Sequence, residues 1–215
     1  MEKHWLRRTG ERQLVIFVLG WGAGPAVVEH VAKLLHADVL VVCDHRDIEP
    51  LSEAELAEIE AYGERFLFAW SLGIVAAECI FGDTKFTRAV ALNGTPLPLD
   101  DETGIGRRRF VATQKALANA GSDEFNRRAY GEFYKKEFTP RGLHADIDEL
   151  AELKALAEKT QYSSIAWDKA VVGAYDAIFP PENMLRYWRQ HAELRPLPHY
   201  PFADADIILR EIDNR

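Results

Sequence analysis

A serine placed between two small residues is the first feature of the sequence suited to chemistry. In "FAWSLGIVAAE", Ser71 follows an apolar run, with Ala69 two residues before it and Gly73 two residues after it. A nucleophilic serine on a sharp strand-to-helix turn requires small residues at these places, because the backbone passes close to itself. The usual pattern has glycine at both places, so Ala69 departs from it. Ser71 is a candidate nucleophile, and the alternative is a serine that caps the helix beginning at Leu72.

An orienting acid and a base for this serine follow it in the chain, in the order that such a site uses. Asp176 and His199 each come shortly after a run that predicts a strand. Because the carboxyl ends of parallel strands meet at one edge of a sheet, we expect both side chains near Ser71. Three competing residues are less well placed, by chain order or by a position before a strand or inside a helix: Asp44, Asp168 and His191.

Two backbone amides must also point at the oxygen that becomes negatively charged when a serine attacks an ester. The residue after the nucleophile, Leu72, supplies one of them. The segment "GWGAG" at 20–24 directly follows an apolar run and is placed to supply the second, from Trp21. A plain glycine-rich turn is the alternative. A phosphate-binding loop is excluded, because the segment lacks the G-x-x-x-x-G-K-[ST] lysine.

These residues would be positioned by a parallel sheet. Runs rich in β-branched residues alternate with helical stretches, as is typical of α/β folds. We predict strands at 14–19, 39–43, 66–69, 89–92, 170–173 and 194–197, and helices at 25–35, 53–62 and 74–81.

The segment from 99 to 161 interrupts this alternation and is predicted to be helical. Phe125, Ala129 and Phe133 share one helical face at intervals of four residues. We therefore divide the chain into a core, residues 1–98 and 162–215, and a helical insertion, residues 99–161, called the cap segment below. Such an insertion is well placed to cover the carboxyl ends of the strands, where parallel sheets bind ligands.

Composition and charge limit the class of protein. The chain has 215 residues, 47% of them hydrophobic and 28% charged, which suits one globular unit. Its net charge of −8 argues against nucleic-acid binding. The longest apolar stretch, 14–28, contains a proline and is too short to span a membrane. Cys43 and Cys79 both lie in apolar runs and lack the C-x-x-C spacing of a metal or redox site. We therefore expect a soluble, cytoplasmic protein, and we expect neither a metal nor a cofactor.

Four segments resemble, in order and spacing, the BioG family of pimeloyl-[acyl-carrier protein] methyl ester esterases: "LGWGAGPAVVEHV", "AWSLGIVAAE", "ALNGTPLPLDDETGI" and "DAIFPPENMLRYW". The resemblance extends from about residue 14 to 199. It implies an α/β-hydrolase fold, a mostly parallel sheet flanked by helices with a helical cap insertion. Carried over by position, it makes Ser71 the nucleophile, Asp176 the acid and His199 the base, with an oxyanion hole formed by the amides of Trp21 and Leu72.

The reaction implied by the resemblance belongs to biotin biosynthesis. It is hydrolysis of the methyl ester at the far end of a pimeloyl chain, which phosphopantetheine holds on acyl-carrier protein, to give pimeloyl-[acyl-carrier protein] and methanol. Acyl-carrier proteins are strongly acidic. Between residues 105 and 141 the chain has nine basic and four acidic residues, a local charge of +5 that leaves −13 for the remainder. Five arginines are candidate contacts for the carrier protein: Arg107, Arg108, Arg109, Arg127 and Arg128.

Aromatic residues near the serine and in the cap segment are candidate contacts for the acyl chain. Trp70 either forms a wall of the acyl pocket or only packs the turn around Ser71, and Phe110 and Phe133 either line the pocket or hold the cap segment together. Two other functions stay open at this point. One is a general short-chain carboxylesterase without a carrier-protein partner, and the other is a catalytically inactive module that binds acyl-carrier protein.

Overall fold

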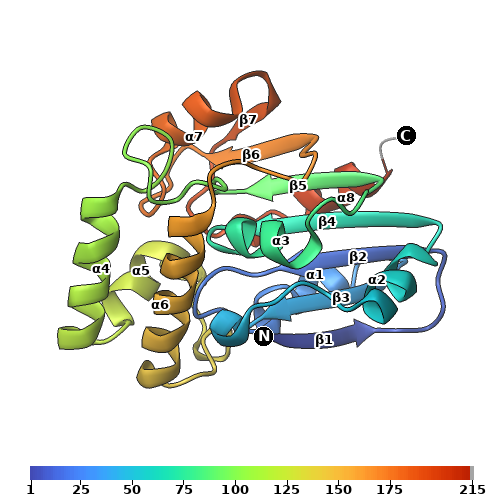
Figure 1. The fold of residues 1–215 in the computed structure, drawn as a ribbon, viewed down its shortest axis with the longest axis horizontal. Helices are drawn as coiled ribbons and strands as arrows, with labels where there is room; N and C mark the ends of the chain where they lie inside the picture. The colour runs from blue at the N-terminus through green and yellow to red at the C-terminus, as the bar shows by residue number, and fades with distance from the viewer. Residues whose placement is uncertain (214–215) are drawn as a thin grey trace.

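A seven-stranded sheet forms the centre of the protein in a computed structural model, which describes residues 1–213 (Figure 1). The strand order is β1-β3-β2-β4-β5-β6-β7. Neighbouring strands are parallel except β1, which pairs antiparallel with β3 at one edge. The strands are β1 (Glu2–Arg7), β2 (Gln13–Val18), β3 (Asp38–Cys43), β4 (Glu64–Trp70), β5 (Arg88–Leu92), β6 (Lys169–Gly173) and β7 (Ala192–Arg195).

Helices cover both faces of the sheet and its carboxyl edge. In Figure 1, α3 lies in front of the sheet and α8 behind it, while α4, α5 and α6 gather at the left, on the side toward which β5 points. The helices are α1 (Glu29–Ala32), α2 (Glu53–Glu60), α3 (Gly73–Phe81), α4 (Arg107–Ala120), α5 (Asp123–Tyr130), α6 (Leu143–Lys159), α7 (Pro181–Trp188) and α8 (Asp206–Asp213).

The parallel α/β architecture confirms the prediction, with differences at particular elements. The strand expected at 194–197 begins two residues earlier, at Ala192. The helix expected at 25–35 is two short pieces, the 3-10 turn η1 (Pro25–Val27) and α1, because Val28 between them leaves regular helical geometry. Strand β1 and helix α8 have no counterpart among the predicted elements.

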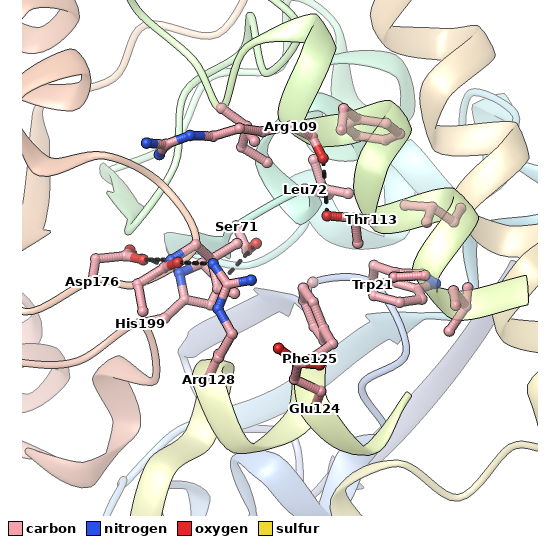
Figure 2. Close-up of a pocket in the computed structure, with 18 of the residues that line it drawn as sticks. Trp21, Ser71, Leu72, Arg109, Thr113, Glu124, Phe125, Arg128, Asp176 and His199 are labelled. Atoms are coloured by element: carbon pink, nitrogen blue, oxygen red, sulfur yellow. Dashed lines mark hydrogen bonds and ion pairs between the residues drawn. The ribbon is translucent and has the colours of Figure 1, made fainter. Parts of the chain in front are cut away.

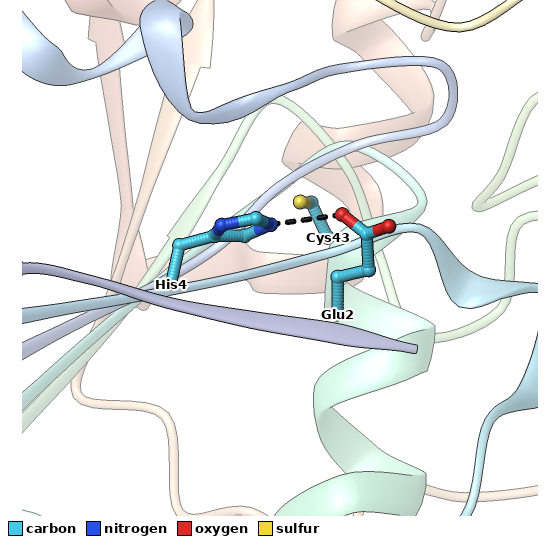
Figure 3. Close-up of side chains that lie close together, drawn as sticks. All are labelled: Glu2, His4 and Cys43. Carbon is cyan, nitrogen blue, oxygen red and sulfur yellow. Dashed lines mark hydrogen bonds and ion pairs between the residues drawn. The ribbon is translucent and has the colours of Figure 1, made fainter.

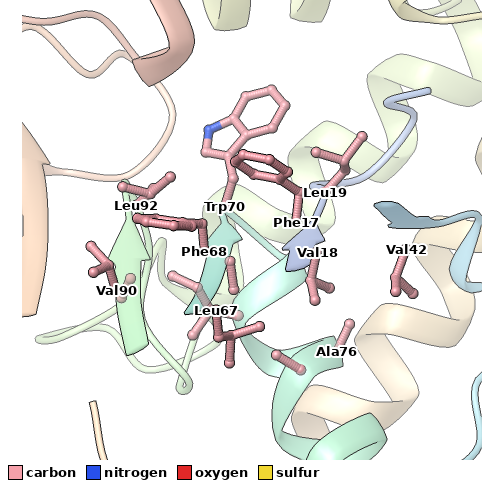
Figure 4. Packing of buried hydrophobic residues seen from close by; sticks show 14 of the residues in the cluster. Phe17, Val18, Leu19, Val42, Leu67, Phe68, Trp70, Ala76, Val90 and Leu92 are labelled. Atoms are coloured by element: carbon pink, nitrogen blue, oxygen red, sulfur yellow. The ribbon is translucent and has the colours of Figure 1, made fainter. Parts of the chain in front are cut away.

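The core consists of the strand side chains on the two faces of the sheet. Figure 4 shows Phe17, Phe68 and Trp70 on one face and Val18 and Leu67 on the other, as the alternation of side chains along a strand requires. Ala76 on α3 packs against the second face. Its small side chain lets the helix approach the sheet closely, so the turn before α3 is fixed by packing on the strands.

The cap segment occupies the space off the carboxyl ends of the strands and contains α4, α5 and α6. Where the chain leaves the core, the Asn183 amide donates to the carbonyl oxygens of Asp101 (3.1 Å) and Gly104 (2.8 Å). Where the chain returns, the buried carboxylate of Glu78 accepts from the amides of Ser164 (2.7 Å) and Ile165 (3.0 Å). Buried side chains therefore secure the chain at the start of the cap segment and directly after its end.

The division into a core and a cap segment stays a proposal, and the last two residues of the proposed core lie outside the described part of the chain. Within residues 1–213, no helix is long and apolar enough to cross a membrane.

Candidate active site

Ser71 lies on a strained turn between β4 and α3. Its φ of 58° is in the left-handed region, which a residue with a side chain adopts only when the surrounding structure imposes it. The turn packs closely against the end of β2. At Gly73 an added Cβ would lie 2.4 Å from the carbonyl oxygen of Val18 and 2.5 Å from that of Leu19, so only glycine fits there. Ala69 is fully buried where the pattern usually has glycine. The turn therefore presents the Ser71 hydroxyl beyond the end of the sheet, as the nucleophile interpretation requires.

The structure brings together the three residues expected to carry the chemistry. His199 Nε2 lies 2.9 Å from Ser71 Oγ, and His199 Nδ1 lies 2.7 Å from Asp176 Oδ2 (Figure 2). Because a carboxylate only accepts hydrogen bonds, it places the imidazole proton on Nδ1 and leaves Nε2 free to accept the serine proton. The other oxygen of Asp176 accepts from the amides of Ile178 (2.7 Å) and Phe179 (2.9 Å). This carboxylate is therefore held in one orientation.

The competing residues lie elsewhere. Asp168 is at the amino end of β6, where its carboxylate accepts from the Ala89 amide (2.8 Å). His191 is exposed, and its ring contacts the carbonyl oxygen of Asp168 (3.3 Å). Asp44 forms an ion pair with Arg46 beside the start of a 3-10 turn. None of the three contacts Ser71 or His199 among the described residues.

Asn93 supports the histidine loop and was not identified in the sequence. It is fully buried at the end of β5, with a φ of 49°. Its amide nitrogen donates to the carbonyl oxygens of Pro198 and His199, both at 2.9 Å, and its oxygen accepts from the Gly173 amide at 2.6 Å. The available signal was an Asn-Gly pair directly after a buried strand, where asparagine tolerates the left-handed conformation.

Trp70 lies where both interpretations of it expect contacts, at the cavity and against the residues around the turn. It lines the cavity next to Ser71, and its indole nitrogen donates to the carbonyl oxygen of His199 (2.8 Å). Its ring also packs edge-on against Tyr130 and Phe202. Trp70 therefore forms part of the cavity wall and positions the histidine loop.

The two residues whose backbone amides are expected to form an oxyanion hole lie at the same cavity. Trp21 and Leu72 both line it beside Ser71. Within residues 1–213, neither amide donates a hydrogen bond to another group of the protein. Both are therefore available to a ligand, which is what an oxyanion hole requires.

A cavity of about 680 Å³ extends from Ser71 under the cap helices (Figure 2). Side chains from α4 and α5 line it together with Trp21, and Phe125 lies edge-on against Trp21 with 4.5 Å between ring centroids. Much of the lining is apolar: Ile105, Phe110, Ala112, Ala116, Leu117, Phe125, Leu150 and Ile178. A volume of this size and character suits an acyl chain.

Phe110 and Phe133, both expected at the acyl chain, lie in different places. Phe110 is buried and lines the cavity. Phe133 is outside the lining, 40% exposed, with its ring against Tyr200. The reason is that α5 ends at Tyr130 and Gly131 has a φ of 57°, so Phe133 does not continue the helical face of Phe125.

The five arginines expected to contact a carrier protein are all exposed but differ in their surroundings. Arg109 and Arg128 line the cavity, and Arg128 also donates to the carbonyl oxygen of Ala177 (2.6 Å). Arg107 forms an ion pair with Glu158 (3.0 Å). Arg108 and Arg127 lie outside the cavity lining. The structure thus divides this set into two residues at the cavity and three on the outer surface.

One group of side chains has the composition of a metal site and lies away from the serine. Glu2, His4 and Cys43 approach one another between β1 and β3, with their ligand atoms within 4.8 Å (Figure 3). Metals bind the thiolate form of cysteine. Burial raises the pKa of the Cys43 thiol to about 12, which disfavours that form. The arrangement is better described as a buried thiol beside a hydrogen bond between His4 and Glu2 at the surface.

Comparisons with known proteins identify the family and the fold. The family model described as pimeloyl-ACP methyl esterase BioG matches residues 1–204. The crystal structure of BioG from Haemophilus influenzae superposes with a TM-score of 0.81 at 28% identity, covering 94% of this chain and 95% of that one.

A Bacteroides fragilis malonyl-[acyl-carrier protein] O-methyltransferase is 28% identical over 188 residues, which are 84% of this chain but 37% of that protein. A hydrolase from Oleispira antarctica shares the fold, with a TM-score of 0.64 at 14% identity over 99% of this chain and 94% of that one. The α/β-hydrolase fold expected from the sequence is confirmed. The chain therefore belongs to the BioG family of pimeloyl-ACP methyl esterases, and so to the carboxylic ester hydrolases.

Proposed function

We propose that the protein hydrolyses the methyl ester of pimeloyl-[acyl-carrier protein] methyl ester to pimeloyl-[acyl-carrier protein] and methanol in biotin biosynthesis. The observation that carries the proposal is the hydrogen-bonded series Ser71, His199 and Asp176 at one end of a largely apolar cavity. Membership of the BioG family supports the choice of ester. A cytoplasmic location is part of the proposal, and the two free cysteines are consistent with it.

The proposed mechanism is acyl transfer through a covalent intermediate. Ser71 Oγ attacks the ester carbonyl while His199 Nε2 accepts its proton, and the amides of Trp21 and Leu72 stabilise the negative oxygen. His199 then gives the proton to the departing methoxide, which leaves as methanol. Water attacks the acyl-enzyme by the same route, releases the carboxylate and regenerates Ser71. Asp176 keeps the imidazole in the required tautomer and stabilises its charged form.

The arginines supply the proposed contact with the carrier protein. Arg109 and Arg128 at the cavity, with Arg107, Arg108 and Arg127 outside it, form a basic surface on an acidic protein. Such a surface orients an acidic partner and speeds its encounter, with an effect that falls as salt rises. A carrier docked there would feed its acyl chain into the cavity with the methyl ester at Ser71, so that the thioester stays out of reach.

Methanol release from methyl-pimeloyl carrier protein tests the assignment. Wild type should release methanol, and Ser71→Ala should lose at least about a thousandfold in kcat. The loaded carrier should keep its thioester, which mass spectrometry of the product shows. Undiminished turnover by Ser71→Ala would contradict the proposal. Failure of a serine-reactive phosphonate to label folded wild type at Ser71 would instead favour an inactive carrier-binding module.

Charge reversal separates this enzyme from a general short-chain carboxylesterase. Arg108→Glu and Arg127→Glu are the informative variants, because both side chains are exposed and lie outside the cavity lining. Together they should lower kcat/KM about tenfold for the carrier-bound ester at low salt and leave p-nitrophenyl butyrate unaffected. Lys33→Glu is the control charge reversal, at an exposed lysine of the core. Equal effects of the arginine changes on both substrates would favour the general esterase.

A further inference from the structure

The loop that carries Trp21 is held in place by the cap segment. Three of the five residues at 20–24 are glycine, so the loop has little conformational preference of its own. Its backbone and side chain reach out to the cap segment at three points. The Gly22 amide donates to Glu149 (2.9 Å), the Trp21 indole nitrogen donates to the carbonyl oxygen of Asp146 (2.7 Å), and the Gly24 amide donates to that of Phe138 (2.8 Å).

Glu149 has the most demanding set of these contacts. It is fully buried on α6, and each of its two carboxylate oxygens accepts from a backbone amide, one from His45 and one from Gly22, both at 2.9 Å. Arg141 donates to the same oxygen as Gly22 (2.6 Å) and neutralises the charge. The carboxylate thus links α6 to the ends of two neighbouring strands, β2 through Gly22 and β3 through His45.

The contact with Gly22 bears directly on the amide of Trp21. Gly22 has a φ of 73°, a conformation open to it as glycine and fixed by its neighbours. The peptide that joins residues 21 and 22 is planar, so the hydrogen bond from the Gly22 amide also fixes the carbonyl group of Trp21. The carbonyl oxygen of Asp146 fixes the Trp21 indole. With the 21–22 peptide and the indole both held, Trp21 has little freedom to turn, and it lines the cavity beside Ser71.

We propose that Glu149 is a positioning residue for the oxyanion hole: its buried carboxylate fixes the loop at 20–24, so that the Trp21 amide is aligned only when α6 is docked. This inference rests on the proposed function, in which the Trp21 amide stabilises the negative oxygen. It makes the cap segment part of the catalytic geometry as well as of the cavity wall.

Glu149→Gln tests this with little change in size. An amide side chain has one oxygen, so its nitrogen must face either the Gly22 or the His45 amide, and two donors then oppose each other. We expect kcat for p-nitrophenyl butyrate to fall about 10- to 100-fold with KM changed less than about threefold, because the lost interaction is made in the transition state. Affinity for a boronate that forms a tetrahedral adduct with Ser71 should fall by a similar factor.

Glu78→Gln is the matched control. Glu78 is also a buried carboxylate that accepts from two backbone amides, those of Ser164 and Ile165 directly after the cap segment, but it does not contact the loop at 20–24. It should lower the melting temperature while leaving kcat within about threefold of wild type. If Glu149→Gln does not fold, Glu149→Asp keeps the charge but cannot reach both amides, and should show the same loss of kcat.

The outcomes separate this inference from the proposed function. Folded Glu149 variants with wild-type kcat and boronate affinity would overturn the positioning role, and so would an equal loss of kcat in Glu78→Gln. A wild type that cleaves p-nitrophenyl butyrate but not the carrier-bound ester would overturn the proposed substrate and leave the positioning role to be decided by the variants. A wild type inactive on both esters would overturn both proposals.

Discussion

Replacing Asn93 by alanine should damage both stability and catalysis, because this buried side chain joins the end of β5 to the loop that carries His199. Removal of its amide leaves the Gly173 nitrogen and the Pro198 oxygen without their partners. The His199 oxygen keeps a partner, the Trp70 indole. A buried polar group left unpaired costs about 1–3 kcal/mol, so two such groups cost about 2–6 kcal/mol. Alanine at a φ of 49° adds about 1 kcal/mol.

The total of about 3–7 kcal/mol is a large part of the 5–15 kcal/mol that usually stabilises a domain of this kind. A shift of His199 by several tenths of an ångström should lower kcat roughly 10- to 100-fold. Asn93→Gly is the control, since it loses the same hydrogen bonds without the backbone strain and should be about 1 kcal/mol more stable than Asn93→Ala.

Urea unfolding followed by tryptophan fluorescence gives the free energies of unfolding, and steady-state hydrolysis of p-nitrophenyl butyrate gives kcat. An Asn93→Ala protein within 1 kcal/mol of wild type and with unaltered kcat would refute the reasoning. Equal stabilities of the alanine and glycine variants would refute the part that concerns backbone strain.

Three further predictions concern other parts of the site. Gly73→Ala should yield almost no folded protein, because its Cβ would lie 2.4 Å from the carbonyl oxygen of Val18; recovery of soluble protein with the wild-type melting temperature would contradict this. Asp146→Asn should raise the free energy of unfolding by about 2–3 kcal/mol at pH 8 and by little at pH 4. Burial raises the pKa of the Asp146 carboxyl from 3.8 to about 6, so ionising this group destabilises the folded state. The destabilisation is absent below pH 4, where the carboxyl is protonated in both the folded and the unfolded state. It grows between pH 4 and 6 and is constant above pH 6. An equal gain in urea unfolding at both pH values would point to a cause other than ionisation. Trp70→Phe should lower kcat about 3- to 10-fold, since the His199 oxygen loses one of two donors and keeps the Asn93 amide; a kcat equal to that of wild type in the same ester assay would show that the indole nitrogen has no positioning role.

The sequence predicts best what depends on local pattern. Continuous β-branched runs marked the buried strands, and chain order with small flanking residues marked Ser71, Asp176 and His199, which the structure brings together. Strand β1 was missed because "EKHWLR" is largely polar and only partly buried, as suits an edge strand.

Features that depend on contacts between distant segments were not predictable in this way. Asn93 has an ordinary turn signal, and its importance comes from carbonyl groups more than 100 residues away. Phe133 was placed by helical periodicity, which fails after Gly131 ends the helix. The contact between Glu149 and the loop at 20–24 spans 127 residues and has no motif at either end.

The hydrogen bonds at the start of the cap segment and directly after its end bear on how a substrate enters. Asn183 secures the chain where it leaves the core and Glu78 where it returns, each through hydrogen bonds of a buried side chain. With the chain held on both sides of its base, the cap segment should resist opening as one rigid piece. Admission of an acyl chain then falls to motions inside the segment, chiefly of α4 and α5, whose side chains line the cavity. Amide hydrogen exchange should accordingly be slow at 163–165 and faster along those two helices, and a bound product should slow exchange in the helices alone.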